Sequence, residues 1–386
     1  MTGPVAASPE VTSWEDRISA RLAAVVDQGR WRSPVTFDAR GPEGDLGSDA
    51  RRVVSFASND YLGLTVHPSV TRAAAEAIAR WGSGAGGSRL ITGTRPVHRD
   101  LETALADWKD AEAAICFPTG FAANLGVLGV LGSEGTSIYS DELNHASIVD
   151  GCRLARGRVS VYRHCDVEHL EALLAADPSP AIVVTDTVFS MDGDVAPLAE
   201  IAQVCRRFGT VLVLDEAHAV LGPELGPEVT DEVTVVRVGT LSKTLGSLGG
   251  YVAGPKMVVD LVVNLARPYI FTTAASPADA AAALAALDVL RSAEGRVLRS
   301  RLEGYVERVA PGHQSPIVPV IVGSEASAVA ASSMLLERGL WVPAIRPPTV
   351  PPGTSRLRVT LSAAHTAQQV EALVRALGGL PRPGRT

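Results

Sequence analysis

The hydrophobic positions along this chain follow two alternating patterns. Short continuous runs rich in Val, Ile and Leu are typical of strands buried on both faces of a parallel sheet. Such runs occur at residues 113–117, 137–141, 158–162, 181–186, 210–214 and 234–238. Segments with helical spacing lie between several of them, at residues 118–131, 167–175 and 197–208. This alternation predicts an α/β protein with a mainly parallel sheet and right-handed crossovers.

The segments on either side of this alternation predict further elements. Residues 14–28 have the spacing of an amphipathic helix, and residues 68–81 and 94–109 predict two more helices. After a long Ala-rich helix at residues 277–291, a compact α/β pattern follows, with strands at 317–322, 341–342 and 356–361 and helices at 326–338 and 366–377. We therefore expect an amino-terminal arm (1–50), a large domain (51–275) and a small α/β carboxy-terminal domain (276–386).

Composition narrows the class of protein. The chain has 386 residues, of which 46% are hydrophobic and 20% are charged, as in ordinary globular proteins. A net charge of −7 without Lys/Arg clusters gives no reason to expect nucleic-acid binding. The four cysteines lack zinc-type spacing and suggest reduced thiols, and we predict no metal site. No signal peptide is recognised in residues 1–16 and no apolar segment reaches membrane-spanning length, so we expect a cytoplasmic protein.

Reactive side chains follow two neighbouring predicted strands. The run at 210–214 ends in Asp215-Glu216-Ala217-His218, and the run at 234–238 ends in Gly-Thr-Leu-Ser-Lys, where the lysine is Lys243. Ligands of parallel sheets lie beyond the carboxyl ends of the strands, so these groups are expected together. Pyridoxal phosphate needs such a pair, because a lysine forms its Schiff base and an acid pairs with its protonated ring nitrogen. Without Asp215, a surface lysine in a Ser-Lys-Thr turn would be the default interpretation.

Two glycine-containing loops are candidate phosphate sites. Residues 118–124 connect a strand to a helix, so the Gly120 amide and Phe121 lie where free backbone N–H groups can bind a phosphate. The alternative there is a plain strand–helix turn. The loop at 82–89 is weaker, because a flexible connection explains it equally well. That loop lacks G-x-x-x-x-G-K-[ST] and no apolar strand directly precedes it, which argues against a P-loop or dinucleotide-binding protein.

The two strand-end motifs together resemble the α-oxoamine synthase family, whose members are pyridoxal-phosphate-dependent enzymes of fold type I. The resemblance covers residues 59–364. It implies a large domain with a sheet of the seven-stranded type and a small α/β carboxy-terminal domain. It also implies a homodimer, in which the segment containing Thr272 reaches across the interface to the cofactor phosphate.

The resemblance also implies roles for single residues. His145, in the motif Asp-Glu-Leu-Asn-His-Ala-Ser, would stack on the cofactor ring, although a lone histidine at a helix start is usually a cap. Ser190 would lie near the cofactor, with a turn serine as its alternative. His218 would bond the phenolic oxygen, and Thr240 would lie beside the Schiff-base turn. Lys243 would also remove the α-proton of the substrate as a general base.

Arginines near the carboxyl terminus suggest the substrates. Arg358 matches the position at which the family binds the amino-acid carboxylate, a task suited to a guanidinium. Arg346 and Thr349 lie in Ile-Arg-Pro-Pro-Thr-Val-Pro, which resembles the branch that joins L-alanine to a pimeloyl thioester, on CoA or a carrier protein, in biotin biosynthesis. Arg32 would help to contact the pimeloyl group. The alternative for any one of these arginines is a surface ion pair.

Two other activities remain open at this point. One is a sibling synthase that uses another amino acid or acyl-CoA, such as a glycine C-acetyltransferase. The other is a fold type I aminotransferase, which would need a second site for a substrate carboxylate. The chain departs from the usual Asp-Asp-Ala-His-Gly motif of the branch at Glu216 and Ala219, and its segment between His218 and Thr240 is shorter than usual.

Overall fold

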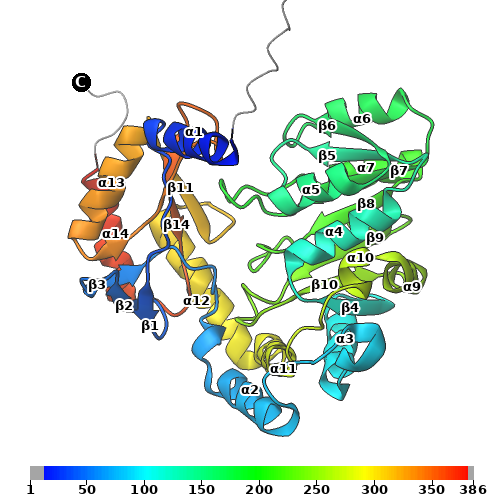
Figure 1. The fold of residues 1–386 in the computed structure, drawn as a ribbon, viewed down its shortest axis with the longest axis horizontal. Coiled ribbons are helices and arrows are strands. Elements are labelled where there is room, and N and C mark those ends of the chain that lie inside the picture. The colour runs from blue at the N-terminus through cyan, green and yellow to red at the C-terminus, as the bar shows by residue number, and fades with distance from the viewer. Residues whose placement is uncertain (1–12, 381–386) are drawn as a thin grey trace, which may run out of the picture.

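The structure, a computed structural model, describes residues 13–380. Most of the segment 1–16, in which we predicted no signal peptide, lies outside these residues. Figure 1 shows two halves joined by the long helices α11 (Pro277–Arg291) and α12 (Ala293–Val309). Across residues 13–380, every helix is too short or too polar to traverse a lipid bilayer.

The larger half is built on a seven-stranded sheet with the order β4-β10-β9-β8-β7-β5-β6. Its strands are β4 (Ala113–Phe117), β5 (Ser137–Asp141), β6 (Arg158–Tyr162), β7 (Ala181–Asp186), β8 (Val211–Asp215), β9 (Thr234–Thr240) and β10 (Gly250–Gly254). The neighbours from β9 to β6 pair in parallel, and β10 runs antiparallel to β4 and β9. The six strands predicted here and the mainly parallel sheet are confirmed.

Strand β10 was not predicted from the sequence. One glycine is required by packing, since a side chain on Gly250 would meet the Gly120 amide at 2.5 Å. The start of α4 (Gly120–Leu131) can therefore approach the sheet closely at this point.

Both faces of this sheet are covered by helices, which explains the continuous apolar runs. Successive residues of β7 and β8 belong to different apolar clusters: Val184 and Val213 pack with α4 and α9, whereas Val183 and Leu212 pack with α6 and α7. The helices of this half are α4, α5 (Ala146–Leu154), α6 (Val167–Ala175), α7 (Leu198–Phe208), α8 (Pro227–Thr230), α9 (Lys256–Leu265) and α10 (Arg267–Ile270).

The smaller half contains two further sheets. One has the order β1-β2-β3-β12 and consists of β1 (Phe37–Ala39), β2 (Glu43–Leu46), β3 (Arg51–Ser55) and β12 (Leu340–Trp341). The other has the order β11-β14-β13 and consists of β11 (Ile317–Gly323), β14 (Ser355–Thr360) and β13 (Ala344–Ile345). Residues 37–55 thus pair with a carboxy-terminal strand, and the domain limits that we drew from the sequence stay a prediction. The helices α13 (Glu325–Glu337) and α14 (Ala367–Gly378) complete this half.

The remaining helices are α1 (Trp14–Asp27), α2 (Pro68–Trp81), α3 (Pro96–Trp108), a 3-10 turn η1 (Leu64–Val66) and a π-helix η2 (Arg89–Gly93). The predicted helix at 14–28 is confirmed, but none of its side chains is buried. Its apolar face, which includes Ile18 and Leu22, is exposed on this chain. Helix α12 was not predicted from the sequence.

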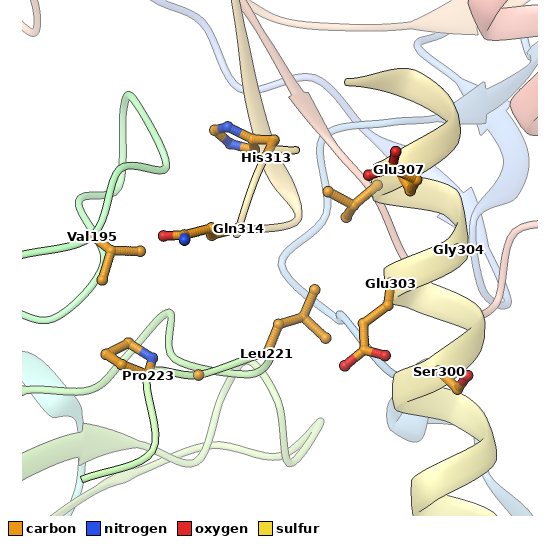
Figure 2. Close-up of a pocket in the computed structure, with 11 residues that line it drawn as sticks. Val195, Leu221, Pro223, Ser300, Glu303, Gly304, Glu307, His313 and Gln314 are labelled. Atoms are coloured by element: carbon orange, nitrogen blue, oxygen red, sulfur yellow. The ribbon is translucent and has the colours of Figure 1, made fainter. Parts of the chain in front are cut away.

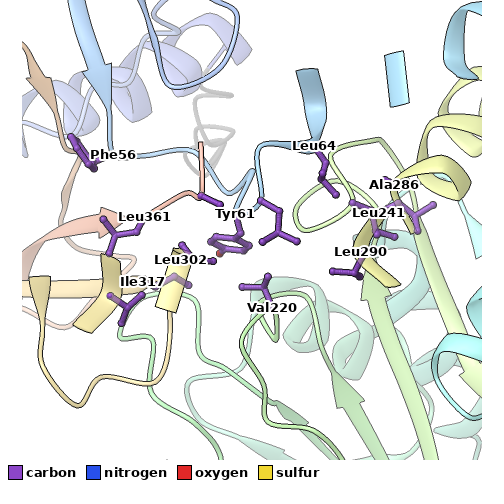
Figure 3. Packing of buried hydrophobic residues seen from close by; sticks show 14 of the residues in the cluster. Phe56, Tyr61, Leu64, Val220, Leu241, Ala286, Leu290, Leu302, Ile317 and Leu361 are labelled. Atoms are coloured by element: carbon purple, nitrogen blue, oxygen red, sulfur yellow. The ribbon is translucent and has the colours of Figure 1, made fainter. Parts of the chain in front are cut away.

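One apolar cluster crosses between the halves. It joins Leu64 and Leu241 on the side of the large sheet to Leu302, Ile317 and Leu361 on the other side. In Figure 3 the fully buried Tyr61 lies among these residues. The cluster fixes the carboxy-terminal strands relative to the large sheet, so groups from both halves can face one cavity.

We predict that Glu102→Ala lowers the free energy of unfolding by about 3–5 kcal/mol. Glu102 binds Arg89 at 2.7 Å, and the two side chains are 7% and 3% exposed. Its carboxylate also accepts the Cys116 amide at 2.9 Å, so the change removes the charge partner of a buried guanidinium and the acceptor of this amide. Urea unfolding followed by circular dichroism measures the change.

The control is Asp260→Ala, which breaks an exposed ion pair with Lys256. It should cost less than about 1 kcal/mol. Equal losses in the two variants would contradict the importance of the buried pair.

Candidate active site

A cavity of about 240 Å³ lies at the carboxyl ends of β7, β8 and β9. Its walls also include the first turn of α4 and the residues at the start of α5. It brings together the following seven residues that we singled out in the sequence: Gly120, Phe121, His145, Asp215, His218, Thr240 and Lys243.

Lys243 is held against His218 in the interior of this cavity. The Lys243 Nζ lies 3.0 Å from His218 Nε2, and His218 Nδ1 lies 2.5 Å from the hydroxyl of Tyr61. Burial lowers the pKa of Lys243, although the nearby carboxylates of Asp215 and Asp186 oppose this shift. Burial, and then the charge of Lys243, hold the pKa of His218 well below its usual value. The site therefore favours a neutral imidazole and an amine that loses its proton more easily than an exposed lysine.

Asp215 is a buried carboxylate oriented by neutral donors. The side-chain amide of Asn124 donates to Oδ2 at 2.7 Å, and the Ala217 backbone N–H donates to Oδ1 at 2.9 Å. Asn124 also donates to the hydroxyl of Ser147 at 2.9 Å, which fixes the amide plane. A carboxylate held in this way can pair with a cationic group of a ligand, which would compensate its burial.

His145 presents an aromatic ring to the same cavity. Its backbone N–H donates to Asp186 at 2.7 Å, and its Nδ1 lies 2.7 Å from the Ser147 hydroxyl. Burial lowers the pKa of His145 and raises the pKa of Asp186 well above its usual value. The Phe121 ring meets the imidazole edge to face at 6.4 Å between centroids. A neutral, fixed imidazole can stack on a flat heteroaromatic ligand.

Backbone amides and hydroxyls lie at one end of the cavity. Gly120 and Phe121 occupy the first turn of α4, where N–H groups have no partner within the helix, and Thr119 caps the third amide at 3.0 Å. The hydroxyls of Thr240 and Ser242 lie 2.7 Å apart beside this turn. Such a helix start is suited to a phosphate.

Arg358 on β14 and Ser190 form a second group of predicted residues outside this cavity. The Arg358 Nε donates to the Ser190 carbonyl at 2.6 Å, and Nη1 donates to Asn59 at 3.2 Å and to Thr360 at 2.9 Å. Arg358 is 6% exposed, and its charge contributes to the lowered pKa of both Lys243 and His218. The Ser190 backbone, rather than its hydroxyl, is the group that contacts Arg358.

Four other predicted residues do not line the cavity. Arg32 and Thr349 are exposed, and Thr272 is half-buried beside the bridge between Ser88 and Thr273. Arg346 donates to the Gly29 carbonyl at 3.1 Å, so the segment around Arg346 contacts the amino-terminal arm just after α1.

A larger cavity of about 660 Å³ contains none of the predicted residues (Figure 2). Figure 2 shows it between α12 and two loops, with Glu303 and Glu307 on the helix and Pro223 and His313 opposite. Its size alone would make it the first choice for a ligand. The smaller cavity is the better candidate for a ligand site, because it contains an amine, a carboxylate and a helix start in one place.

Sequence reasoning missed three residues of the smaller site. Tyr61 supports His218, Asn124 orients Asp215, and Asp186 holds the backbone of His145. Asp186 ends an apolar run just as Asp215 does, so its position could have been noticed. Tyr61 and Asn124 carry no such signal, because their partners lie 157 and 91 residues away.

The donor set fits pyridoxal phosphate. Lys243 supplies an amine for the aldehyde, Asp215 a carboxylate for the ring nitrogen, and the start of α4 a seat for the phosphate. The imidazole of His145 supplies the aromatic face. Each chemical group of the cofactor thus has a matching group among the residues present.

Comparison with known proteins agrees with this geometry. Residues 51–377 match the family aminotransferase class I and II. The chain is 48% identical to an 8-amino-7-oxononanoate synthase of Anaeromyxobacter dehalogenans, over 95% of each chain. Its fold matches the serine palmitoyltransferase of Sphingomonas wittichii, with a TM-score of 0.87, 33% identity and coverage of 96% of this chain and 100% of the other. It also matches a variant of the serine palmitoyltransferase of S. paucimobilis solved with a bound PLP–myriocin aldimine, with a TM-score of 0.86, 31% identity and coverage of 94% and 96%.

We predict that pyridoxal phosphate, fixed by borohydride at pH 7.5, labels Lys243 and neither of the other two lysines, Lys109 and Lys256. The lowered pKa of Lys243 leaves more of its amine neutral and reactive. Lys109 is paired with Glu216 at 2.6 Å, and Lys256 is an exposed amine paired with Asp260 at 2.6 Å. Peptide mass spectrometry locates the label.

Labelling of Lys243 should weaken as the pH falls, because the amine is then protonated. The Lys243→Ala variant serves as the control and should lose nearly all of the label. Equal labelling of Lys256 and Lys243 would contradict an activated amine in the cavity.

Proposed function

This chain belongs to the aminotransferase class I and II family, and within it to the α-oxoamine synthases, and we propose that it condenses L-alanine with a pimeloyl thioester. The product would be 8-amino-7-oxononanoate, a step of biotin biosynthesis, and the cofactor would be pyridoxal phosphate. The observation that carries the proposal is the 48% identity over 95% of both chains with an 8-amino-7-oxononanoate synthase. The cavity supports it, because Lys243, His218 and Asp215 meet there.

Each of these residues of the cavity would bind a different part of the cofactor. Lys243 would hold it covalently, and Asp215, oriented by Asn124, would pair with its ring nitrogen. His145 would stack on the ring, and His218 would bond its phenolic oxygen. The amides of Gly120 and Phe121 would bind the phosphate. When bound, pyridoxal phosphate supplies an electron sink for the α carbon of the amino acid.

Lys243 would also move the proton. Its amine would take the α-proton of L-alanine, a task favoured by the lowered pKa of this group. The α carbon would then form a bond to the acyl carbon while the thioester C–S bond breaks and the thiol leaves. The alanine carboxylate would leave as CO₂, and a proton would return to the α carbon.

Arg358 would bind the carboxylate of L-alanine. Its guanidinium is fixed by Ser190 and Asn59, and it lies near enough to lower the pKa of Lys243. A guanidinium held by three partners is pre-organised for one orientation of a carboxylate. Arg32, Arg346 and Thr349 would contact the pimeloyl group from the arm and the segment that meets it.

The active unit would be a homodimer in the cytoplasm. Thr272 lies outside the cavity of its own chain, next to Phe271, which is 70% exposed, and the π-helix residue Ile91 is 81% exposed. Exposed apolar groups of this kind mark contact surfaces. Helix α1 presents a further exposed apolar face elsewhere on the molecule. The cysteines are unpaired thiols, which agrees with a reducing compartment.

We predict that the purified protein releases CoA thiol when it receives L-alanine and pimeloyl-CoA. Parallel reactions contain glycine with acetyl-CoA and glycine with succinyl-CoA, and thiol reagents follow the release. Release only with the first pair, and its loss in Lys243→Ala, would establish the proposed reaction. Release only with another pair would replace it by a sibling synthase. No release from protein that carries the cofactor would reject CoA as the donor and direct the assay to a pimeloyl carrier protein.

We predict that Arg358→Lys raises KM for L-alanine by roughly 10–150-fold, because hydrogen bonds to charged groups contribute about 1.5–3 kcal/mol. Lysine keeps the charge but loses the planar guanidinium that Ser190 and Asn59 orient. Steady-state kinetics at saturating pimeloyl-CoA measure the change. Arg308→Gln, which alters an exposed pair with Glu371, is the control and should leave KM unchanged. An unchanged KM in Arg358→Lys would remove Arg358 from the binding site.

A further inference from the structure

The imidazole of His164 lies between two carboxylates. Its Nδ1 is 3.0 Å from Asp141 at the end of β5, and its Nε2 is 2.7 Å from Asp194. Both ring nitrogens therefore face acceptors, and only an imidazolium can donate to both. Burial alone lowers the pKa of His164, but the hydrogen bonds to Asp141 and Asp194 outweigh it and raise the pKa to about 12.

Asp141 is a fixed support for this imidazolium. Its side chain is 1% exposed and accepts the backbone N–H groups of Leu143 and Cys165 at 2.9 and 2.8 Å. Asp141, His164 and Cys165 lie close enough to suggest a metal site. The imidazole nitrogens, however, are both directed at carboxylates, which suits a bound proton better than a metal ion.

Asp194, the other partner, belongs to a short hairpin at residues 188–195. A bridge between Val188 and Val195 closes its base. Within it the Phe189 N–H donates to the Asp194 carbonyl at 3.0 Å, and the Gly193 N–H donates to the Phe189 carbonyl at 2.8 Å. The buried Phe189 ring packs edge to face on His164 at 4.4 Å. His164 thus contacts the hairpin through both an ion pair and an aromatic ring.

The tip of the 188–195 hairpin contacts the smaller half of the molecule. The Ser190 carbonyl accepts from Arg358, and the Asp192 carboxylate pairs with Arg356 on the same strand β14. Gly193 packs directly against the Ile317 carbonyl of β11, where a side chain would not fit. At the base, Thr187 donates through both its N–H and its hydroxyl to the Asp215 carbonyl, at 2.9 and 3.0 Å.

We propose that His164, bonded through both ring nitrogens to Asp141 and Asp194, is a positioning residue that holds the 188–195 hairpin so that Ser190 orients Arg358. The inference rests on the proposed function, in which Arg358 binds the alanine carboxylate. His164 touches neither the cavity nor any group assigned to the reaction, so it acts through the hairpin alone. When this bridge is lost, Asp194 is released, and the hairpin no longer holds the Ser190 carbonyl that orients the Arg358 guanidinium.

His164→Gln tests this inference, because glutamine cannot bridge two carboxylates as a cation. The matched control is His169→Gln, in which a half-buried histidine of α6 loses its contact with the Arg163 N–H. We expect KM for L-alanine to rise about tenfold in His164→Gln while kcat stays within about twofold, the pattern of a lost binding contact. The visible band of the bound cofactor should not change, and the control should behave as the wild type.

Hydrogen exchange provides a readout that needs no substrate. The Phe189 and Gly193 amides, which bond within the hairpin, should exchange about tenfold faster in His164→Gln and at the wild-type rate in His169→Gln. Unchanged exchange of these two amides in folded His164→Gln would overturn the inference. Faster exchange with an unchanged KM would overturn its link to Arg358.

Asp194→Asn is the second variant, and it keeps the inference testable if His164→Gln does not fold. It should raise KM by a similar factor, and the double variant should add little to either single change, because the two residues form one contact. If the increases in KM of the two single variants add up in the double variant, His164 and Asp194 act separately, and this would contradict the inference. Alanine binding is also measured by its effect on the cofactor band, so a failure of thiol release in the wild type rejects the proposed function without hiding the result for His164.

Discussion

The whole site depends on keeping one amine and several carboxyl groups together in a region from which water is largely excluded. Asp215, Asp186 and His218 are all buried, and Lys243 points among them. Polar and ionisable groups buried in this way are tolerated only when each has a hydrogen-bond partner. Asn124 and the Ala217 amide satisfy Asp215, and Tyr61 satisfies His218. The sheet supplies the geometry, since the carboxyl ends of the neighbouring parallel strands β7, β8 and β9 line one cavity.

The sequence was informative where a side chain follows directly from a buried strand. Asp215 and Lys243 could be placed together because parallel strands end at a common edge. Six strands of the large sheet were also predicted, because their continuous apolar runs are typical of strands buried on both faces. Strand β10 and the short strands β1, β2 and β13 were not predicted, because Gly-Tyr-Val-Ala-Gly and segments of two to four residues give no periodic signal. Helix α12 is largely polar and exposed, so its pattern was missed.

The rest of the site could not be read from the sequence, because it depends on contacts between distant residues. Tyr61 reaches His218 only through the packing of residues 56–64 in the cluster that joins the two halves. Arg358 was identified by resemblance, but its link to the Ser190 backbone spans 168 residues. Arg32 and Thr349 are exposed on a single chain. A sequence pattern reports which face of an element is buried, and it does not report which distant element covers that face.

The distribution of lysines has a practical consequence for handling this protein. Lys109 is 11% exposed and paired with Glu216, Lys243 lies inside the cavity, and Lys256 is 67% exposed at the start of α9. Helix α9 contributes no residue to the cavity. Apart from the amino terminus, coupling chemistry directed at amines would therefore attach the protein to a solid support through Lys256 alone. Molecules attached through Lys256 would share one orientation, with the residues of the cavity left unmodified.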